Sequence, residues 1–328
     1  MKKGLLFVLI CMMFAGCARG WDDDSQYAIR TRAVFFTSPA QSTVGLSLIR
    51  YADGIVTRDW NETAAGIRTV DLSDVDMRDN ALWLANTTGR SVHQINPEDG
   101  TQLQFIAGLP IMPHYIAVGR DQLMAADTVE DRIVFVRLRN GKVTEANVDG
   151  KPGICMYQNG RFFLRVDATQ IHIYDEKAMT PRAKLEVSKP VIELQTDRYN
   201  TIRLFCKEDS AYYFASISGN ADDFIEINGA DVFWNAAFRK IRYTPYFDPR
   251  FGTEYLQDLR LRDSIVETAQ GQAFTNRAEN FEVDFFEGQL FYTDAGMLYR
   301  FDLNSMELVD SVSFSGEMRR AFFQYGGE

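Results

Sequence analysis

Apolar and polar positions alternate with a period of two along most of this chain, which is the pattern of half-buried β-strands. The clearest stretch is Ala81–Leu103, where an apolar strand, a polar turn, a second alternating strand and an Asp-Gly turn follow one another. Asn140-Gly141 is a further tight-turn dipeptide of the kind that joins antiparallel strands. No segment holds the apolar stripe of an amphipathic helix over three turns. The chain is therefore expected to be all-β.

The same strand–turn–strand unit recurs along the chain. Its copies begin near Ala33, Ala81, Gln122, Arg161, Thr201, Thr244 and Gln289. A repeat of about 40 residues matches a blade of four antiparallel strands. Seven units predict a seven-bladed β-propeller. The sixth hairpin is stretched by Phe247–Thr253, and if it is not a blade the alternative is a six-bladed ring.

A short apolar strand precedes most units and is predicted to be the innermost strand of its blade. These strands are Tyr115–Val118, Ile154–Tyr157, Ile192–Gln195, Val232–Ala236 and Phe281–Phe285. The first unit has no such strand before it, whereas Ala321–Tyr325 has the inner-strand pattern and no hairpin after it. We therefore expect the C-terminal strand to complete the first blade and close the ring, which leaves no open sheet edge.

The N-terminal segment has a different pattern. Lys2 and Lys3 precede an apolar run over Leu5–Phe14, and Ala15-Gly16 stands directly before Cys17. The run is shorter than the ~20 residues of a spanning helix, and the three zones are those of a secretory signal. Cys17 resembles the acylated cysteine of a bacterial lipobox, and the alternative is an ordinary signal peptide with a chance cysteine. The resemblance implies a signal peptide over 1–16, a lipidated tether over 17–30 and a propeller domain over 31–328.

The charge of the chain restricts its partners. A formal net charge of −10 disfavours nucleic acid, which needs a basic face, and also electrostatic attachment to anionic lipid. The acidic run Asp22–Asp24 behind Cys17 resembles the surface-export signal of Bacteroidota lipoproteins, although a solvated tether has the same composition. The expected location is the outer membrane, with a lipid anchor and the protein facing the cell exterior.

Two cysteines remain once Cys11 is removed with the signal peptide and Cys17 is acylated. Cys155 and Cys206 could pair in an oxidising compartment or stay as free buried thiols, and the sequence leaves both open. There is no C-x-x-C and no cysteine–histidine cluster with zinc spacing. No metal and no cofactor are therefore expected.

Two of the units carry a family resemblance. Ala81–Leu103 and Leu290–Asn304 resemble the YVTN-type propeller repeat, which runs strand, Thr/Ala-Asn, turn, strand, Asp/Asn and a short Gly turn. Propellers of this kind on Bacteroidota surfaces include the vitamin-B12-capturing lipoproteins, which are accessories to a TonB-dependent outer-membrane transporter. The resemblance implies an architecture and a class of function, a surface binding protein, but no particular ligand.

Candidate binding residues follow from the propeller geometry, because the loops entering the inner strands and the turns between second and third strands gather on one face. These positions hold His114, Trp234, Asp248, Arg250, Arg319, Asn86, Asp127, Asp167 and Asp294. The recurrent Asp and Asn indicate either Asx turns or a ring that binds a cation or a polyhydroxylated ligand. His114 is either structural or a ligand or acid–base group. Trp234 offers stacking area for a sugar or ring, or packs between blades.

Signatures of catalysis are missing from the chain. It contains no G-x-S-x-G elbow, no H-E-x-x-H and no phosphate loop. The sequence favours a protein that binds a small molecule, a glycan or a partner protein. One alternative is a structural or interaction subunit of a surface complex, because the long sixth hairpin carries Tyr246, Phe247 and Phe251. A glycan-processing enzyme is the lesser alternative, since its carboxylates can assemble across blades without local spacing.

Overall fold

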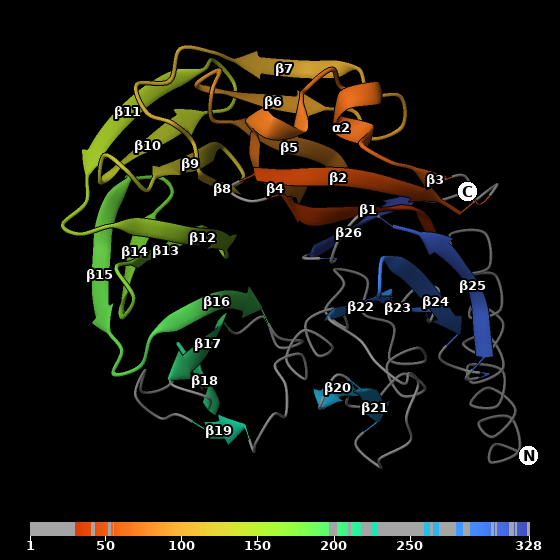
Figure 1. Ribbon diagram of the computed structural model, residues 1–328. Helices are drawn as coiled ribbons and strands as arrows, with labels where there is room; N and C mark the ends of the chain where they lie inside the picture. Colours follow the sequence, from red (N-terminus) through yellow and green to blue (C-terminus); the bar gives the residue numbers. More distant parts are fainter. Residues whose placement is uncertain are drawn as a thin grey trace, which may run out of the picture.

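The computed structural model describes residues 30–40, 43–51, 54, 56–196, 202–208, 211–217, 225–227, 259–262, 265–268, 280–284, 289–302, 305, 307–314, 318 and 320–326. Within these ranges the strands form six four-stranded antiparallel sheets and one two-stranded sheet. The sheets surround a common centre like the blades of a propeller (Figure 1). The prediction of an all-β propeller is confirmed.

The blades keep the same strand order from the centre outward. The first contains β26 (Arg320–Gly326), β1 (Arg30–Ala40), β2 (Thr43–Arg50) and β3 (Val56–Thr57). The second contains β4 (Leu72–Arg78), β5 (Ala81–Asn86), β6 (Ser91–Ile95) and β7 (Gln102–Ile106). The third contains β8 (Tyr115–Val118), β9 (Gln122–Asp127), β10 (Arg132–Arg137) and β11 (Lys142–Asn147).

The later sheets continue this arrangement. The fourth contains β12 (Pro152–Gln158), β13 (Arg161–Val166), β14 (Gln170–Asp175) and β15 (Thr180–Glu186). The fifth contains β16 (Val191–Thr196), β17 (Ile202–Glu208), β18 (Ala211–Ser216) and β19 (Ile225–Ile227). A two-stranded sheet of β20 (Leu259–Arg262) and β21 (Ile265–Thr268) follows, and the last contains β22 (Asn280–Asp284), β23 (Gln289–Asp294), β24 (Met297–Asp302) and β25 (Glu307–Ser313).

The predicted repeat units coincide with these blades. β5, β9, β13 and β23 begin at the predicted residues, and β8, β12, β16 and β22 are the predicted inner strands. The inner strand β4 was not predicted, because Asp74 and Asp76 interrupt its apolar positions. The predicted strand Val232–Ala236 lies outside the described residues. Since β20 and β21 alone represent the sixth unit here, the count of seven blades stays a prediction.

The C-terminal strand closes the ring as expected. β26 pairs antiparallel with β1, from Arg30 opposite Gly326 to Thr37 opposite Arg320. The first blade therefore joins the two ends of the propeller, and its inner strand comes from the end of the chain (Figure 1). Closure by β26 leaves no unpaired edge on β1.

Two short helical turns, α2 (Trp60–Thr63) and η2 (Thr69–Asp71), connect the first blade to the second. Asn61 of α2 is fully buried, and its side chain accepts the Leu46 amide at 3.0 Å and donates to the Ile67 carbonyl at 2.8 Å. The ring of Trp60 packs edge-on against the ring of Phe35 in β1, with 5.1 Å between the two ring centroids. These contacts dock the connection on the first blade. Neither turn approaches the length of a membrane-spanning helix, and the described residues contain no helix that does.

Apolar side chains fill the spaces between adjacent blades. Between the second and third blades, Trp83 of β5 packs in one cluster with Ile116, Leu123 and Val134, and only 3% of Trp83 remains exposed. Trp83 therefore lies in the second strand of its blade and packs between two blades. Such packing fixes the angle between neighbouring sheets and so holds the inner strands around one axis.

Candidate functional site

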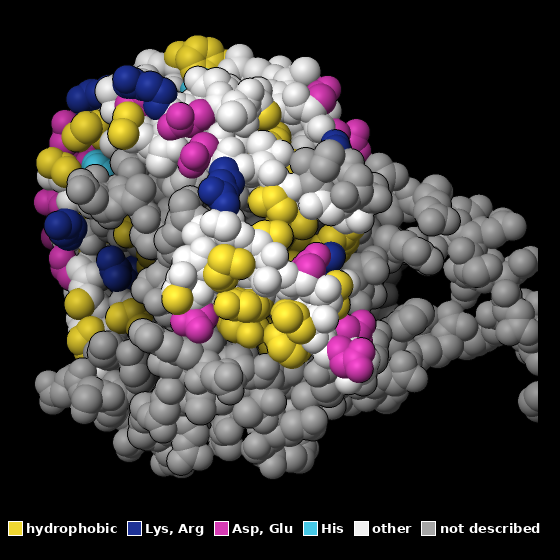
Figure 2. All heavy atoms as spheres, turned by 45° about the vertical axis from the view of Figure 1, so that its right-hand side comes forward, with side chains coloured by type: hydrophobic (Ala, Val, Ile, Leu, Met, Phe, Trp, Pro, Cys, Tyr) yellow, Lys and Arg dark blue, Asp and Glu magenta, His cyan; other side chains and the backbone are white. Residues whose placement is uncertain are grey.

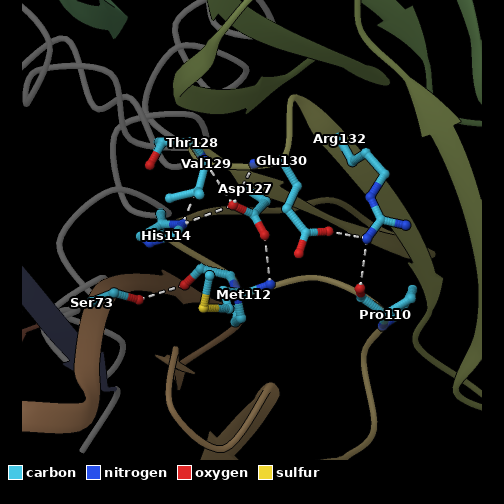
Figure 3. A network of polar contacts seen from close by, with 10 residues as sticks. Ser73, Pro110, Met112, His114, Asp127, Thr128, Val129, Glu130 and Arg132 are labelled. Carbon is cyan, nitrogen blue, oxygen red and sulfur yellow. Dashed lines mark hydrogen bonds and ion pairs between the residues drawn. The ribbon is translucent and has the colours of Figure 1, made fainter.

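His114 and Asp127 meet at the entrance to the third blade (Figure 3). His114 precedes β8 and Asp127 ends β9, and these strands pair antiparallel, so the start of one lies beside the end of the other. The Nδ1 atom of His114 lies 3.4 Å from Oδ1 of Asp127 and accepts the Thr128 amide at 3.3 Å. The structure therefore brings one predicted entry-loop residue together with one predicted turn residue.

The carboxylate of Asp127 accepts its hydrogen bonds from backbone amides. The residue is fully buried, and its oxygens accept the amides of Met112 at 2.8 Å, Val129 at 2.8 Å and Glu130 at 3.2 Å. These bonds join the entry loop of β8 to the turn after β9 (Figure 3). Buried carboxylates need such donors, because an unpaired charge out of water is costly. The arrangement is that of an Asx turn extended by one bond to a second loop.

Asn86 and Asp167 have comparable local partners. Asn86 accepts the Gly89 amide at 2.6 Å within the turn after β5. Asp167 has a φ of 51° and accepts the Lys151 amide at 2.9 Å, which ties the turn after β13 to the loop entering β12. Asp294 ends β23 and pairs in register with Met297. Asn86, Asp127 and Asp167 thus each stabilise their own blade, as the Asx-turn interpretation requires.

The remaining candidates are not placed. Cys17, Trp234, Asp248, Arg250 and Arg319 lie outside the described residues. Cys155 and Cys206 are both free thiols. In the part of the chain that the structure describes, no group of three His, Cys, Asp or Glu side chains could hold a metal ion.

A second set of polar residues lies on the inner strands and was not predicted. It comprises Asp74 and Asp76 of β4, Glu193 of β16, Glu282 of β22 and Arg320 of β26, all of them partly buried. We call this set the axial cluster. Asp76, Glu193 and Glu282 lie opposite Trp83, Phe205 and Phe291, in each case the fourth residue from the end of the second strand. Because blades are related by rotation, these equivalent positions fall at a similar height along the axis.

Arg320 is the cation of the axial cluster. Its Nη1 atom lies 3.7 Å from Oδ1 of Asp74, and its Cζ atom lies 5.1 Å from the ring centroid of Phe322. Burial lowers the pKa of the guanidinium, but the carboxylates of Asp74, Glu193, Asp76 and Glu282 raise it further, so the net pKa is above the ordinary value. The residue therefore stays charged, with carboxylates from three other inner strands within electrostatic range.

Arg320 is half-buried at the first position of β26. Its side chain keeps 37% of its surface open to solvent, so part of it is in contact with water.

Asp74 and Asp76 also hold the neighbouring blade. Oδ2 of Asp74 accepts the Ile116 amide at 2.9 Å, and Oδ2 of Asp76 accepts the Val118 amide at 2.8 Å. Both amides belong to β8, so the two carboxylates pair with the free edge of the next inner strand. The second oxygen of Asp76 accepts the Met77 amide at 2.8 Å, whereas the second oxygen of Asp74 faces Arg320.

Cys155 of β12 adds no charge to this region. Burial raises the pKa of its thiol well above the ordinary value, and the carboxylates of Asp74 and Asp76 add to the effect. The thiol therefore stays protonated at neutral pH. A protonated thiol is a poor nucleophile, so Cys155 is not set up for covalent chemistry.

The outer surface offers less definite chemistry. Acidic, basic and apolar side chains are interspersed over the described part of the face in Figure 2. This face has no field of one sign that would attract a polyanion or a polycation. The axial cluster is therefore the more specific candidate site.

Comparisons with known proteins agree on the architecture. No family model matches the chain, and no curated protein matches it by sequence. A quinonprotein alcohol dehydrogenase-like protein from Bacteroides thetaiotaomicron superposes with a TM-score of 0.61 at 9% identity, covering 90% of this chain and 78% of that one.

Two further solved structures resemble the chain at 11% identity and a TM-score of 0.52 each. The Pan2 WD40 domain of Neurospora crassa covers 87% of this chain and 88% of its own. Hydrazine synthase of Kuenenia stuttgartiensis covers 75% of this chain and 88% of its own. At such low identity these likenesses show the fold alone. The chain is a β-propeller.

Proposed function

We propose that this protein is a lipid-anchored propeller that binds a small polar ligand at the entry end of its axis. The observation that supports the proposal is Arg320, a half-buried guanidinium on the inner strand β26 that lies 3.7 Å from the carboxylate of Asp74, while carboxylates of three other inner strands raise its pKa. Charged groups converging in a recess are the usual means by which a binding site fixes a polar ligand. His114, which stands before β8, lies toward the same end of the axis.

Binding fits the described residues better than catalysis does. Backbone amides donate hydrogen bonds to both oxygens of Asp127 and to both oxygens of Asp76, so these two carboxylates have structural roles. The Cys155 thiol is protonated. A glycan-processing reaction would need an uncommitted pair of carboxyl groups at a defined separation.

The cellular setting is the second part of the proposal. The segment ending at Cys17 supports export and a lipid anchor, and Asp22–Asp24 supports display on the cell exterior. In that setting a ligand-binding propeller would deliver its ligand to an outer-membrane transporter, and a TonB-dependent receptor is the partner we propose. The alternative of an interaction subunit depends on Tyr246, Phe247 and Phe251 of the sixth hairpin, which lie outside the described residues.

Ligand capture tests the proposal directly. The full-length protein, purified in detergent, is incubated with an extract of growth medium, and bound small molecules are identified by native mass spectrometry. Arg320→Met should abolish the captured species. Arg182→Met is the matched control, because Arg182 lies on the outer strand β15 with 56% of its side chain exposed. A captured species that is equally abundant in both variants would place the site elsewhere, and no captured species in any sample would contradict the binding function.

A further inference from the structure

Basic side chains gather at the end of the propeller where the inner strands finish, which we call the exit end. They lie in or beside the turns that join β8 to β9, β10 to β11, β12 to β13 and β14 to β15, on the third and fourth blades. These residues are Arg120, Arg137, Arg139, Lys142, Arg161 and Lys177, and we call them the basic patch. All are at least partly exposed, and with the residues that the structure describes none of them forms an ion pair.

Backbone contacts hold these four turns side by side. The Leu138 amide donates to the Asp121 carbonyl at 3.0 Å, which joins the two turns of the third blade. The Glu176 amide donates to the Gly160 carbonyl at 3.1 Å, which joins the two turns of the fourth blade. The buried carboxylate of Glu176 accepts the Asp121 amide at 2.8 Å and so links the two blades. The basic patch is therefore one continuous surface.

The acidic residues of this surface do not cancel its charge. Glu176 is buried beneath the turns. The Asp175 carboxylate lies 3.7 Å from Nη1 of Arg182 and accepts the Lys177 amide at 3.0 Å. Asp121 is exposed and is the one remaining carboxylate in these turns. The basic patch therefore has a positive field, although the net charge of the whole chain is −10.

The sign of the charge changes on the neighbouring second blade. At its exit end stand Arg78, Asp79, Glu98 and Asp99, so acidic residues outnumber the basic one there. At physiological ionic strength, charges act over a Debye length of ~8 Å, and a flat surface at this end would respond to the nearest groups. The net charge of the chain therefore does not exclude an anionic partner for the basic patch.

The N-terminal segment joins the propeller at the same end. β1 begins at Arg30, which pairs with Gly326 at the end of the inner strand β26. The tether of the proposed lipid anchor, residues 17–30, therefore reaches the propeller at its exit end. The entry end, where His114 precedes β8, is the opposite one.

We propose that the basic patch binds the anionic headgroups of the membrane that holds the lipid anchor, so that the exit end faces the lipid and the entry end faces away from it. This inference rests on the lipid anchor of the proposed function. Four of the six cations are arginines, whose planar guanidinium matches a phosphate group with two parallel hydrogen bonds. Each basic residue near an anionic surface adds to the attraction.

Vesicle binding tests the basic patch without the acyl chain. The mature chain from residue 17 with Cys17→Ser keeps every described residue. It is sedimented with vesicles of phosphatidylcholine alone and with vesicles in which phosphatidylglycerol makes up one third of the lipid. The protein should bind the anionic vesicles only, and added salt should release it, because salt screens exposed charges.

A pair of double variants locates the binding surface. Arg139→Gln with Lys142→Gln should weaken binding to the anionic vesicles at least about tenfold. Arg90→Gln with Lys151→Gln is the matched control, because it removes the same charge from exposed residues at the entry end, and its binding should be unchanged. Thermal melts of both double variants check that the ring is intact.

Lysine labelling tests the orientation of the acylated protein. The protein is reconstituted in anionic vesicles and treated with an amine-reactive reagent, and the labelled sites are identified by mass spectrometry. Lys142 and Lys177 should be labelled less than they are in detergent. Lys151, at the entry end, should be labelled equally in both settings.

Three results would overturn the inference. The first is equal binding by the two double variants, and the second is labelling of Lys142 and Lys177 that is the same in vesicles and in detergent. The third is retention on heparin without binding to anionic vesicles, which would assign the basic patch to a soluble polyanion. None of these results touches the lipid anchor, which the fractionation of full-length Cys17→Ser tests separately. If the anchor fails in that experiment, the vesicle assay still decides whether the basic patch binds anionic lipid.

Discussion

Replacing Asp127 by Ala tests whether the polar residues at the blade turns are structural. Its carboxylate is fully buried and accepts three amides from two loops. The Met112 amide belongs to a partly buried residue, and losing its acceptor should cost about 1–3 kcal/mol. Val129 and Glu130 are exposed, so their amides can turn to water and add about 1 kcal/mol between them. We expect a total loss of about 2–4 kcal/mol.

The loss should appear as a lower midpoint of urea unfolding at an unchanged slope, and as a fall in Tm of roughly 3–6 °C for a domain of this size. Glu130→Gln is the control, because Glu130 is exposed and its ion pair with Arg132 should contribute at most about 1 kcal/mol. Ligand affinity of the folded Asp127→Ala protein should be unchanged. A variant with normal stability and lost binding would refute the structural interpretation and restore the acidic ring as a ligand site.

Three further predictions concern the core, the ring closure and the anchor. Trp83→Ala should lose about 3–5 kcal/mol in denaturant unfolding, because the indole is 97% buried between two blades, and a loss below about 1 kcal/mol would contradict that packing. Deleting Ala321–Glu328 should lower the Tm of the whole domain, since it removes most of the strand that pairs with β1, and a melt within a degree or two of the full chain would argue against closure by β26. Cys17→Ser should move the protein from the membrane fraction to the soluble fraction, whereas unchanged fractionation together with retained acyl label would refute the anchor.

The hairpins of the propeller were predictable because their signals are local. Strand alternation and turn dipeptides such as Asp99-Gly100 and Asn140-Gly141 act within a few residues, so unit starts at Ala81 and Gln122 coincide with β5 and β9. Ring closure was predictable from a mismatch between the ends of the chain. The first unit has no inner strand before it and the C-terminal strand has no hairpin after it, so pairing the two completes one blade.

The inner strand β4 could not be predicted from the local pattern of apolar residues. Its carboxylates stand where an apolar residue was expected, since Asp74 and Asp76 bond to the amides of Ile116 and Val118 in the next blade. Those amides are 42 residues away in sequence, and no local pattern records the pairing. The same applies to Arg320, whose surroundings are created only when the ring closes.

A signal for the axial cluster was nevertheless present in the sequence. Acidic residues interrupt three of the inner strands, as Asp74 and Asp76 in β4, Glu193 in β16, and Glu282 and Asp284 in β22. By ladder register, Asp76, Glu193 and Glu282 lie opposite Trp83, Phe205 and Phe291, in each case the fourth residue from the end of the second strand. A charge within a short apolar strand is unfavourable for packing unless it has polar partners, and rotation of the blades about one axis gathers the equivalent positions into a cluster. Asp76 shows one purpose of such a charge, because its carboxylate accepts the Val118 amide of the next blade and so links two neighbouring inner strands.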